Sequence, residues 1–95
     1  MFEISRYKIN GIEFIKTCEW CPEQYYVKDM SGKIVGYVRL RFGHITCRYP
    51  DVNGKLIYEE TVGDEFTGMF YDEKQRIYNL KKISDEIIKI VGDNT

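Results

Sequence analysis

The stretch that decides the fold is residues 33–50, KIVGYVRLRFGHITCRYP. Its first half alternates apolar and polar side chains with the period of two that a half-buried β-strand shows. Gly43-His44 then offers a tight turn with glycine in the first central position. We therefore expect strands over 33–42 and 45–50 to form an antiparallel hairpin that has one apolar and one polar face.

Further runs extend this hairpin in both directions along the chain. Asn-Gly pairs at 10–11 and 53–54 are the pairs that type I′ turns prefer, and Ser-Gly at 31–32 marks another turn. The runs between these turns are rich in β-branched and aromatic residues. The sequence therefore predicts an antiparallel meander of about five to six strands, over 2–9, 12–17, 24–30, 33–42, 45–50 and 55–61.

The period changes after the last of these strands. Apolar residues now recur every three to four positions, as on one face of an amphipathic helix. Asp72 followed by Gln75 has the pattern of a capping box, and Gly92 is expected just beyond the helix end. The prediction is a single α+β domain over 1–95, in which one C-terminal helix, about 72–91, packs on the apolar face of the sheet.

The composition excludes several classes of protein. The 95 residues carry 14 Lys and Arg against 15 Asp and Glu, which gives a net charge of −1 and argues against a generally cationic nucleic-acid binder. No apolar run approaches the length of about 18 residues that a transmembrane helix needs. The beginning also lacks the apolar run of a secretion signal. We therefore expect a cytoplasmic protein with no membrane partner.

Catalytic and metal chemistry have few candidate residues. His44 is the only histidine and falls in an expected turn, which is a poor place for a positioned base. With no phosphate-binding glycine loop and no Ser nucleophile elbow, we expect a non-enzymatic protein without a cofactor. A zinc site remains an alternative, because one histidine and three cysteines form a valid ligand set: Cys18, Cys21, His44 and Cys47. Against it, an extended strand points His44 and Cys47 apart.

The polar face of the predicted sheet is the best candidate for a binding site. Arginine and tyrosine are enriched at the centres of protein interfaces, and the turn registers place five of them here: Tyr26, Tyr37, Arg39, Arg41 and Arg48. The predicted registers set Arg39 opposite Arg48, an unfavourable pair, and Glu59 opposite Arg48. The face is thus either a solvated surface neutralised by its own carboxylate or a site for an anionic partner.

A resemblance accompanies this pattern. Residues 21–60 contain the blocks Pro22-Glu23-Gln24-Tyr25, Val35-Gly36-Tyr37, Arg39-Leu40-Arg41 and Pro50-Asp51. In these blocks and their order the stretch resembles a group of small uncharacterised proteins encoded by bacteriophages and prophages. The resemblance implies an origin in a mobile element, and it brings no activity with it.

Three kinds of partner fit the predicted face. The favoured one is an unidentified protein of a host or phage. A homodimer that buries Tyr37 and Ile57 is a close variant. The alternative is single-stranded nucleic acid, because aromatic and arginine side chains on a sheet can hold unpaired bases.

Overall fold

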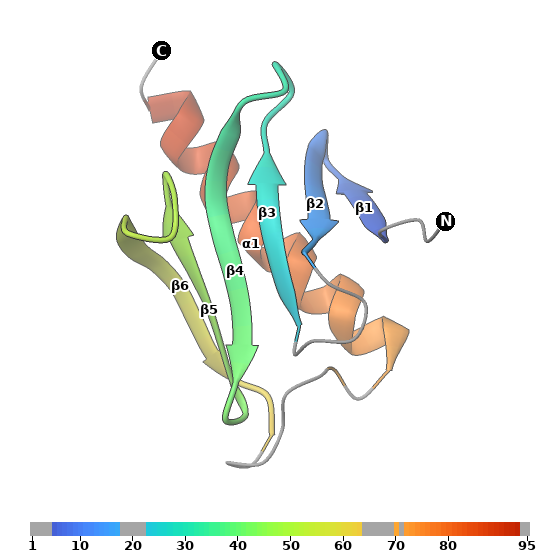
Figure 1. Ribbon diagram of the computed structural model, residues 1–95. Coiled ribbons are helices and arrows are strands. Elements are labelled where there is room, and N and C mark those ends of the chain that lie inside the picture. The colour runs from blue at the N-terminus through green and yellow to red at the C-terminus, as the bar shows by residue number, and fades with distance from the viewer. Residues whose placement is uncertain (1–4, 18–22, 64–69, 71, 94–95) are drawn as a thin grey trace.

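The computed structural model describes residues 5–17, 23–63, 70 and 72–93. Its elements are β1 (Arg6–Ile9), β2 (Ile12–Lys16), β3 (Gln24–Lys28), β4 (Ile34–Arg41), β5 (His44–Tyr49), β6 (Lys55–Thr61) and α1 (Glu73–Asp93). The strands form one antiparallel sheet whose order in space is their order in the chain, and α1 lies across one face (Figure 1). The predicted α+β class, a meander of strands with one C-terminal helix, is confirmed.

The third strand is shorter than predicted, and its end has a local cause. It stops at Lys28 rather than at residue 30, because Asp29 turns the chain. The Asp29 carboxylate accepts hydrogen bonds from the backbone N–H groups of Ser31 at 2.9 Å and Lys33 at 3.0 Å. Such a side-chain turn competes with the strand ladder. The start predicted for the first strand, at residues 2–4, lies outside the described residues.

The turn between β4 and β5 is one residue away from the predicted position. Phe42 and Gly43 both have positive φ, 54° and 75°, and Arg41 pairs with His44. The turn is therefore centred on Phe42-Gly43, and the predicted Gly43-His44 turn is wrong. Two positive φ values are what a type I′ turn needs. The sequence did not indicate this turn, because phenylalanine rarely adopts a positive φ.

The turn between β5 and β6 also differs from the prediction. Neither Asn53 nor Gly54 has a positive φ, so the expected type I′ turn is absent there. Instead, the backbone N–H of Gly54 donates to the carbonyl of Asp51 at 2.9 Å. The carboxylate of Asp51 also accepts the backbone N–H of Asn53 at 2.9 Å. Because Pro50 has no N–H for the ladder, β5 ends at Tyr49 and the loop is longer than two residues.

The helix begins as predicted and ends later. The Asp72 carboxylate accepts the backbone N–H of Gln75 at 2.9 Å, which confirms Asp72 as the N-cap. The helix then continues through Gly92 to Asp93, so the predicted end before Gly92 is wrong. A glycine in a helix lowers stability by only about 1 kcal/mol relative to alanine, which does not prevent the last turn from forming.

The hydrophobic core lies between α1 and the sheet. The helix contributes Leu80, Ile83 and Ile87, all fully buried. The strands contribute a matching set that includes Phe14, Tyr25, Val38, Leu40, Ile45 and Cys47. With the helix on one side only, the other face of the sheet has no layer of secondary structure over it among the described residues (Figure 1).

Candidate functional site

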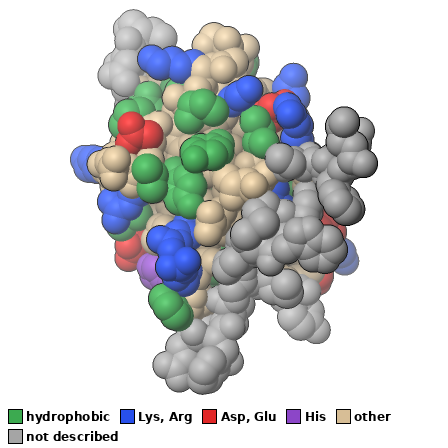
Figure 2. All heavy atoms as spheres, viewed as in Figure 1, with side chains coloured by type: hydrophobic (Ala, Val, Ile, Leu, Met, Phe, Trp, Pro, Cys, Tyr) green, Lys and Arg blue, Asp and Glu red, His purple; other side chains and the backbone are tan. Residues whose placement is uncertain are grey.

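The face of the sheet opposite α1 is the candidate site, and we call it the outer face. Side chains alternate along a strand, so the neighbours of buried residues such as Tyr25, Leu40 and Cys47 point to this face. Figure 2 looks onto it and shows hydrophobic side chains at the centre with Lys and Arg side chains around them. The five residues predicted for the site all fall here: Tyr26, Tyr37, Arg39, Arg41 and Arg48.

Two tyrosines from adjacent central strands form the middle of the outer face. Tyr26 of β3 lies directly opposite Tyr37 of β4, with ring centroids 5.7 Å apart and planes at 62°. The Tyr37 hydroxyl donates to Oε1 of Gln24 at 2.9 Å, which fixes that ring, and partial burial raises the pKa of the hydroxyl. Tyr26 stays 47% exposed. The pair is thus an aromatic surface in which one ring is anchored and the other is open.

The arginines have different neighbours from those predicted. The shifted turn pairs Arg39 with Thr46 and Tyr37 with Arg48, so the predicted Arg39–Arg48 pair is wrong. A register irregularity after Cys47 brings Leu56 opposite Arg48. The predicted pairing of Arg48 with Glu59 is therefore wrong as well.

Glu59 lies elsewhere on the face. It pairs across the ladder with Thr46, and its carboxylate is 3.8 Å from Nε2 of His44. Among the described residues no carboxylate lies within ion-pair distance of Arg39, Arg41 or Arg48. The internal neutralisation that the sequence suggested is thus not formed by these residues.

The contacts that the arginines do make are weak or uncharged. Arg48 donates to the backbone carbonyl of Gly54 at 3.1 Å, and the Arg41 guanidinium lies 5.9 Å from the ring centroid of Phe42. Nε of Arg39 is buried and has no hydrogen-bond acceptor among the described residues. A guanidinium carries five N–H donors, so each of the three arginines keeps donors on its Nη atoms that an added acceptor could use, whereas the buried Nε of Arg39 is out of reach.

Charge is unevenly distributed over the molecule. Alternation assigns two carboxylates to the outer face, Glu13 and Glu59, and six basic side chains, Arg6, Lys8, Lys28, Arg39, Arg41 and Arg48. The whole chain has a net charge of −1. The described part of the outer face is therefore strongly positive although the protein is not.

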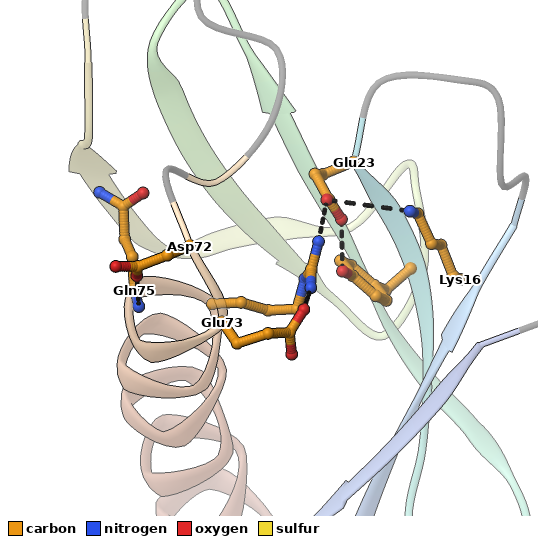
Figure 3. A network of polar contacts seen from close by, with 7 residues as sticks. Lys16, Glu23, Asp72, Glu73 and Gln75 are labelled. Carbon is orange, nitrogen blue, oxygen red and sulfur yellow. Dashed lines mark hydrogen bonds and ion pairs between the residues drawn. The ribbon is translucent and has the colours of Figure 1, made fainter.

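A second polar cluster lies inside the molecule, where α1 begins (Figure 3). Glu23 is buried directly before β3, with Nη2 of Arg76 at 2.5 Å from Oε1 and Nζ of Lys16 at 3.8 Å. The Tyr25 hydroxyl donates to the other carboxylate oxygen, and its pKa is raised by burial and by this bond. The guanidinium of Arg76 also lies 5.4 Å from the ring centroid of Tyr7. With its carboxylate occupied in this way, Glu23 joins the sheet to the helix.

This cluster was not predicted, although the sequence contains a signal for it. Glu23 has the same strand parity as Tyr25, so it is a charged residue on the apolar face. Arg76 precedes Leu80 by four positions and therefore lies on the apolar stripe of the helix. Two opposite charges on two buried surfaces that face each other indicate a buried ion pair.

The candidate zinc ligands are not brought together where the structure describes them. Cys47 is fully buried in the core, and burial raises the pKa of its thiol to about 12. His44 lies on the outer face, where Nδ1 is 3.3 Å from the Thr61 hydroxyl. Cys18 and Cys21 lie outside the described residues. The divergence of His44 and Cys47 follows the strand geometry that the sequence predicted.

No family model, curated protein or solved structure matches this chain. Among the described residues, no helix combines the length and the apolar character that crossing a bilayer requires.

Proposed function

We propose that this protein is a non-enzymatic binding protein that holds an anionic macromolecule, of a phage or of its host, on the outer face. The contact residues are Tyr26, Tyr37, Arg39, Arg41 and Arg48. One observation carries the proposal: the three arginines have no ion-pair partner among the described residues. Like charges gathered on one face repel one another, so an anionic partner relieves a repulsion that the folded chain leaves in place.

The composition of the face supports binding rather than solvation alone. An open aromatic ring with arginines around it is the usual make-up of the energetically important centre of an interface. Tyrosine contributes contact area with little loss of conformational entropy, and arginine donates hydrogen bonds in a fixed geometry. The surrounding basic residues would speed the encounter with an anionic surface.

A homodimer through the same face is less well supported. Two copies placed face to face would bring two sets of unneutralised arginines together, which is unfavourable in a partly desolvated interface. Ile57, expected at such an interface, instead packs against the core of its own chain. Ile57 has no cross-strand partner on β5. Tyr58 pairs with Cys47 and Leu56 with Arg48, so Ile57 lies between them at a β-bulge. We therefore favour a partner of opposite charge.

The test is affinity purification from the native host with a charge-reversed outer face. In Arg39→Glu with Arg41→Glu, we expect loss of the captured partner, because the two central cations become anions. The melting temperature should be unchanged, since neither arginine forms an ion pair with a described residue. The matched control is Lys74→Glu with Lys81→Glu, which makes the same charge change at exposed positions of α1.

The control protein should retain the partner, and salt should release that partner from both the control and the unmodified protein. Capture of the same partner by the arginine variant would show that the outer face is not the contact surface. Failure of the unmodified protein to capture any macromolecule would contradict the proposal itself.

A further inference from the structure

We infer that the anionic partner is single-stranded nucleic acid, with a base against Tyr26 and phosphates along Arg39, Arg41 and Arg48. This inference rests on the proposed function, because it assigns an occupant to the same outer face. It requires three properties of that face: an aromatic surface open to a base, cations with free donors, and a shape that suits unpaired strands.

The aromatic surface is open in the required way. Tyr26 and Tyr37 meet at 62° rather than stacking in parallel, so neither ring is sandwiched against the other. Tyr37 is held by its hydrogen bond to Gln24 and supports Tyr26 from the side. Tyr26 is about half exposed and lies on a central strand. Aromatic rings on central strands of a sheet are a known way to stack unpaired bases.

The cations lie on the β4 and β5 side of this ring. Arg39 and Arg41 are on β4, the strand that carries Tyr37, and Arg48 on β5 pairs directly with Tyr37. Arg39 and Arg41 are two residues apart on the same side of a strand, a spacing of about 7 Å. A backbone running along β4 would pass both guanidinium groups while its bases reach the tyrosines.

The shape favours single strands over duplex. The outer face is the surface of a sheet, and the described residues place no helix or ribbon there that could enter a groove (Figure 1). In a duplex the bases are already paired and stacked, so Tyr26 would have no base face to contact. Two polar groups of the outer face can also bond the edges of unpaired bases: the Gln24 amide, which accepts the Tyr37 hydroxyl, and the Thr46 hydroxyl, which lies opposite Arg39.

An acidic protein surface could form ion pairs with the three arginines, but its carboxylates would not stack on the Tyr26 ring. Carboxylates pair with guanidinium groups regardless of Tyr26, whereas a stacked base requires its ring. The ring and the charges can therefore be tested separately.

The experiment is a fluorescence-anisotropy titration with a labelled oligothymidine of about twelve nucleotides. If three phosphates are neutralised, affinity should fall about 20-fold between about 50 mM and 200 mM salt. In Arg39→Gln with Arg41→Gln, affinity should be lower and the fall over the same salt range only about threefold. Lys74→Gln with Lys81→Gln, on α1, is the control and should behave as the unmodified protein. The same sequence in a duplex should bind more weakly.

The stacking contribution is measured by a second pair of variants. Tyr26→Ala should weaken binding about tenfold or more without changing the salt dependence, because stacking involves no counterion release. Tyr26→Phe keeps the ring and should retain the affinity. Failure of the single strand to bind at about 50 mM salt would overturn the inference, as would an unchanged salt dependence in the double arginine variant.

These results separate the inference from the proposed function. If the oligonucleotide does not bind but affinity purification captures an acidic protein that depends on Arg39 and Arg41, the outer face is a protein-binding site and the inference is wrong. If neither partner is held, both are wrong.

Discussion

Glu23 and Arg76 show how single charged residues can hold two layers of a small domain together. Their side chains are 4% and 13% exposed. Burying two charges removes them from water, and their attraction offsets that loss only when both are present and well bonded. Here the Tyr25 hydroxyl and Lys16 supply further partners for the carboxylate. Removing one member therefore leaves a buried charge with too few partners.

We expect Arg76→Met to lower the free energy of unfolding by about 3 kcal/mol, because it leaves the Glu23 carboxylate buried without its closest cation. Methionine retains an apolar side chain beside Tyr7, so the fall in the free energy of unfolding comes mainly from loss of the positive charge of Arg76. In the double variant Glu23→Gln with Arg76→Met, the loss should be smaller than the sum of the single losses by about 1–3 kcal/mol. Equilibrium urea unfolding measures all three values.

Glu73→Gln is the internal control for this cycle. Its carboxylate also pairs with Arg76 but is 66% exposed. Exposed ion pairs contribute at most about 1 kcal/mol, so this variant should lose far less than Arg76→Met. Additive losses in the Glu23 and Arg76 cycle would show that the two residues are not coupled.

Among the elements, the hairpin of β4 and β5 contains an unusual turn residue. Phe42 has a φ of 54° and is 72% exposed. The left-handed conformation is unfavourable for most side chains by about 1–2 kcal/mol, and asparagine tolerates it better. Among the described residues, the ring interaction of Phe42 is a long contact with the Arg41 guanidinium, 5.9 Å from the ring centroid.

We therefore expect Phe42→Asn to stabilise the protein by about 0.5 kcal/mol, since it converts the turn to the Asn-Gly pair that type I′ hairpins prefer. Thermal unfolding followed by circular dichroism measures the change. Phe42→Ala removes the same ring while keeping an unfavourable residue in the turn, so it should give no stabilisation. Equal stabilisation in both variants would mean that the exposed ring, rather than the backbone, was responsible.

This turn also explains which parts of the prediction were correct. Moving a two-residue turn by one position changes every cross-strand partner, but each residue keeps its face of the sheet. Tyr37, Arg39 and Arg41 could therefore be assigned to the outer face from alternation alone. The partners of Arg39 and Arg48 could not, because they depend on φ values that the identity of Phe42 did not indicate. The Asn10-Gly11 turn, with both φ values positive, was predicted correctly.

At the scale of the whole molecule, binding of an anionic partner depends on how charged side chains are distributed over the surface, and not on the net charge. The net charge of −1 argues against a generally cationic nucleic-acid binder. Among the described residues, however, six of the 14 basic side chains share the outer face with two carboxylates. Alternation within β4 already places Arg39 and Arg41 on this face, and the strand pairings add Arg6, Lys8 and Lys28 to it. The total composition could not have shown this distribution.

The same distribution of charge predicts the behaviour of the free protein. We expect it to sediment as a monomer at about 50 mM salt, where charges repel over roughly 14 Å and the outer faces of two copies keep apart. Sedimentation velocity over a range of concentrations is the measurement. A dimer that forms at low salt and is lost in Tyr37→Ala would show instead that the outer face pairs with itself.

The order of the strands has a consequence for how the chain folds. In the part of the chain that the structure describes, each strand pairs with its neighbours in sequence, so the sheet can assemble by successive local hairpins, which is a rapid route. The helix, however, is made after all six strands. While the chain is being synthesised, the surface formed by Phe14, Tyr25 and Leu40 has no cover until α1 leaves the ribosome. During that interval a nascent chain of this protein would expose the apolar face of its sheet to solvent. Chaperones bind exposed apolar surfaces of this kind.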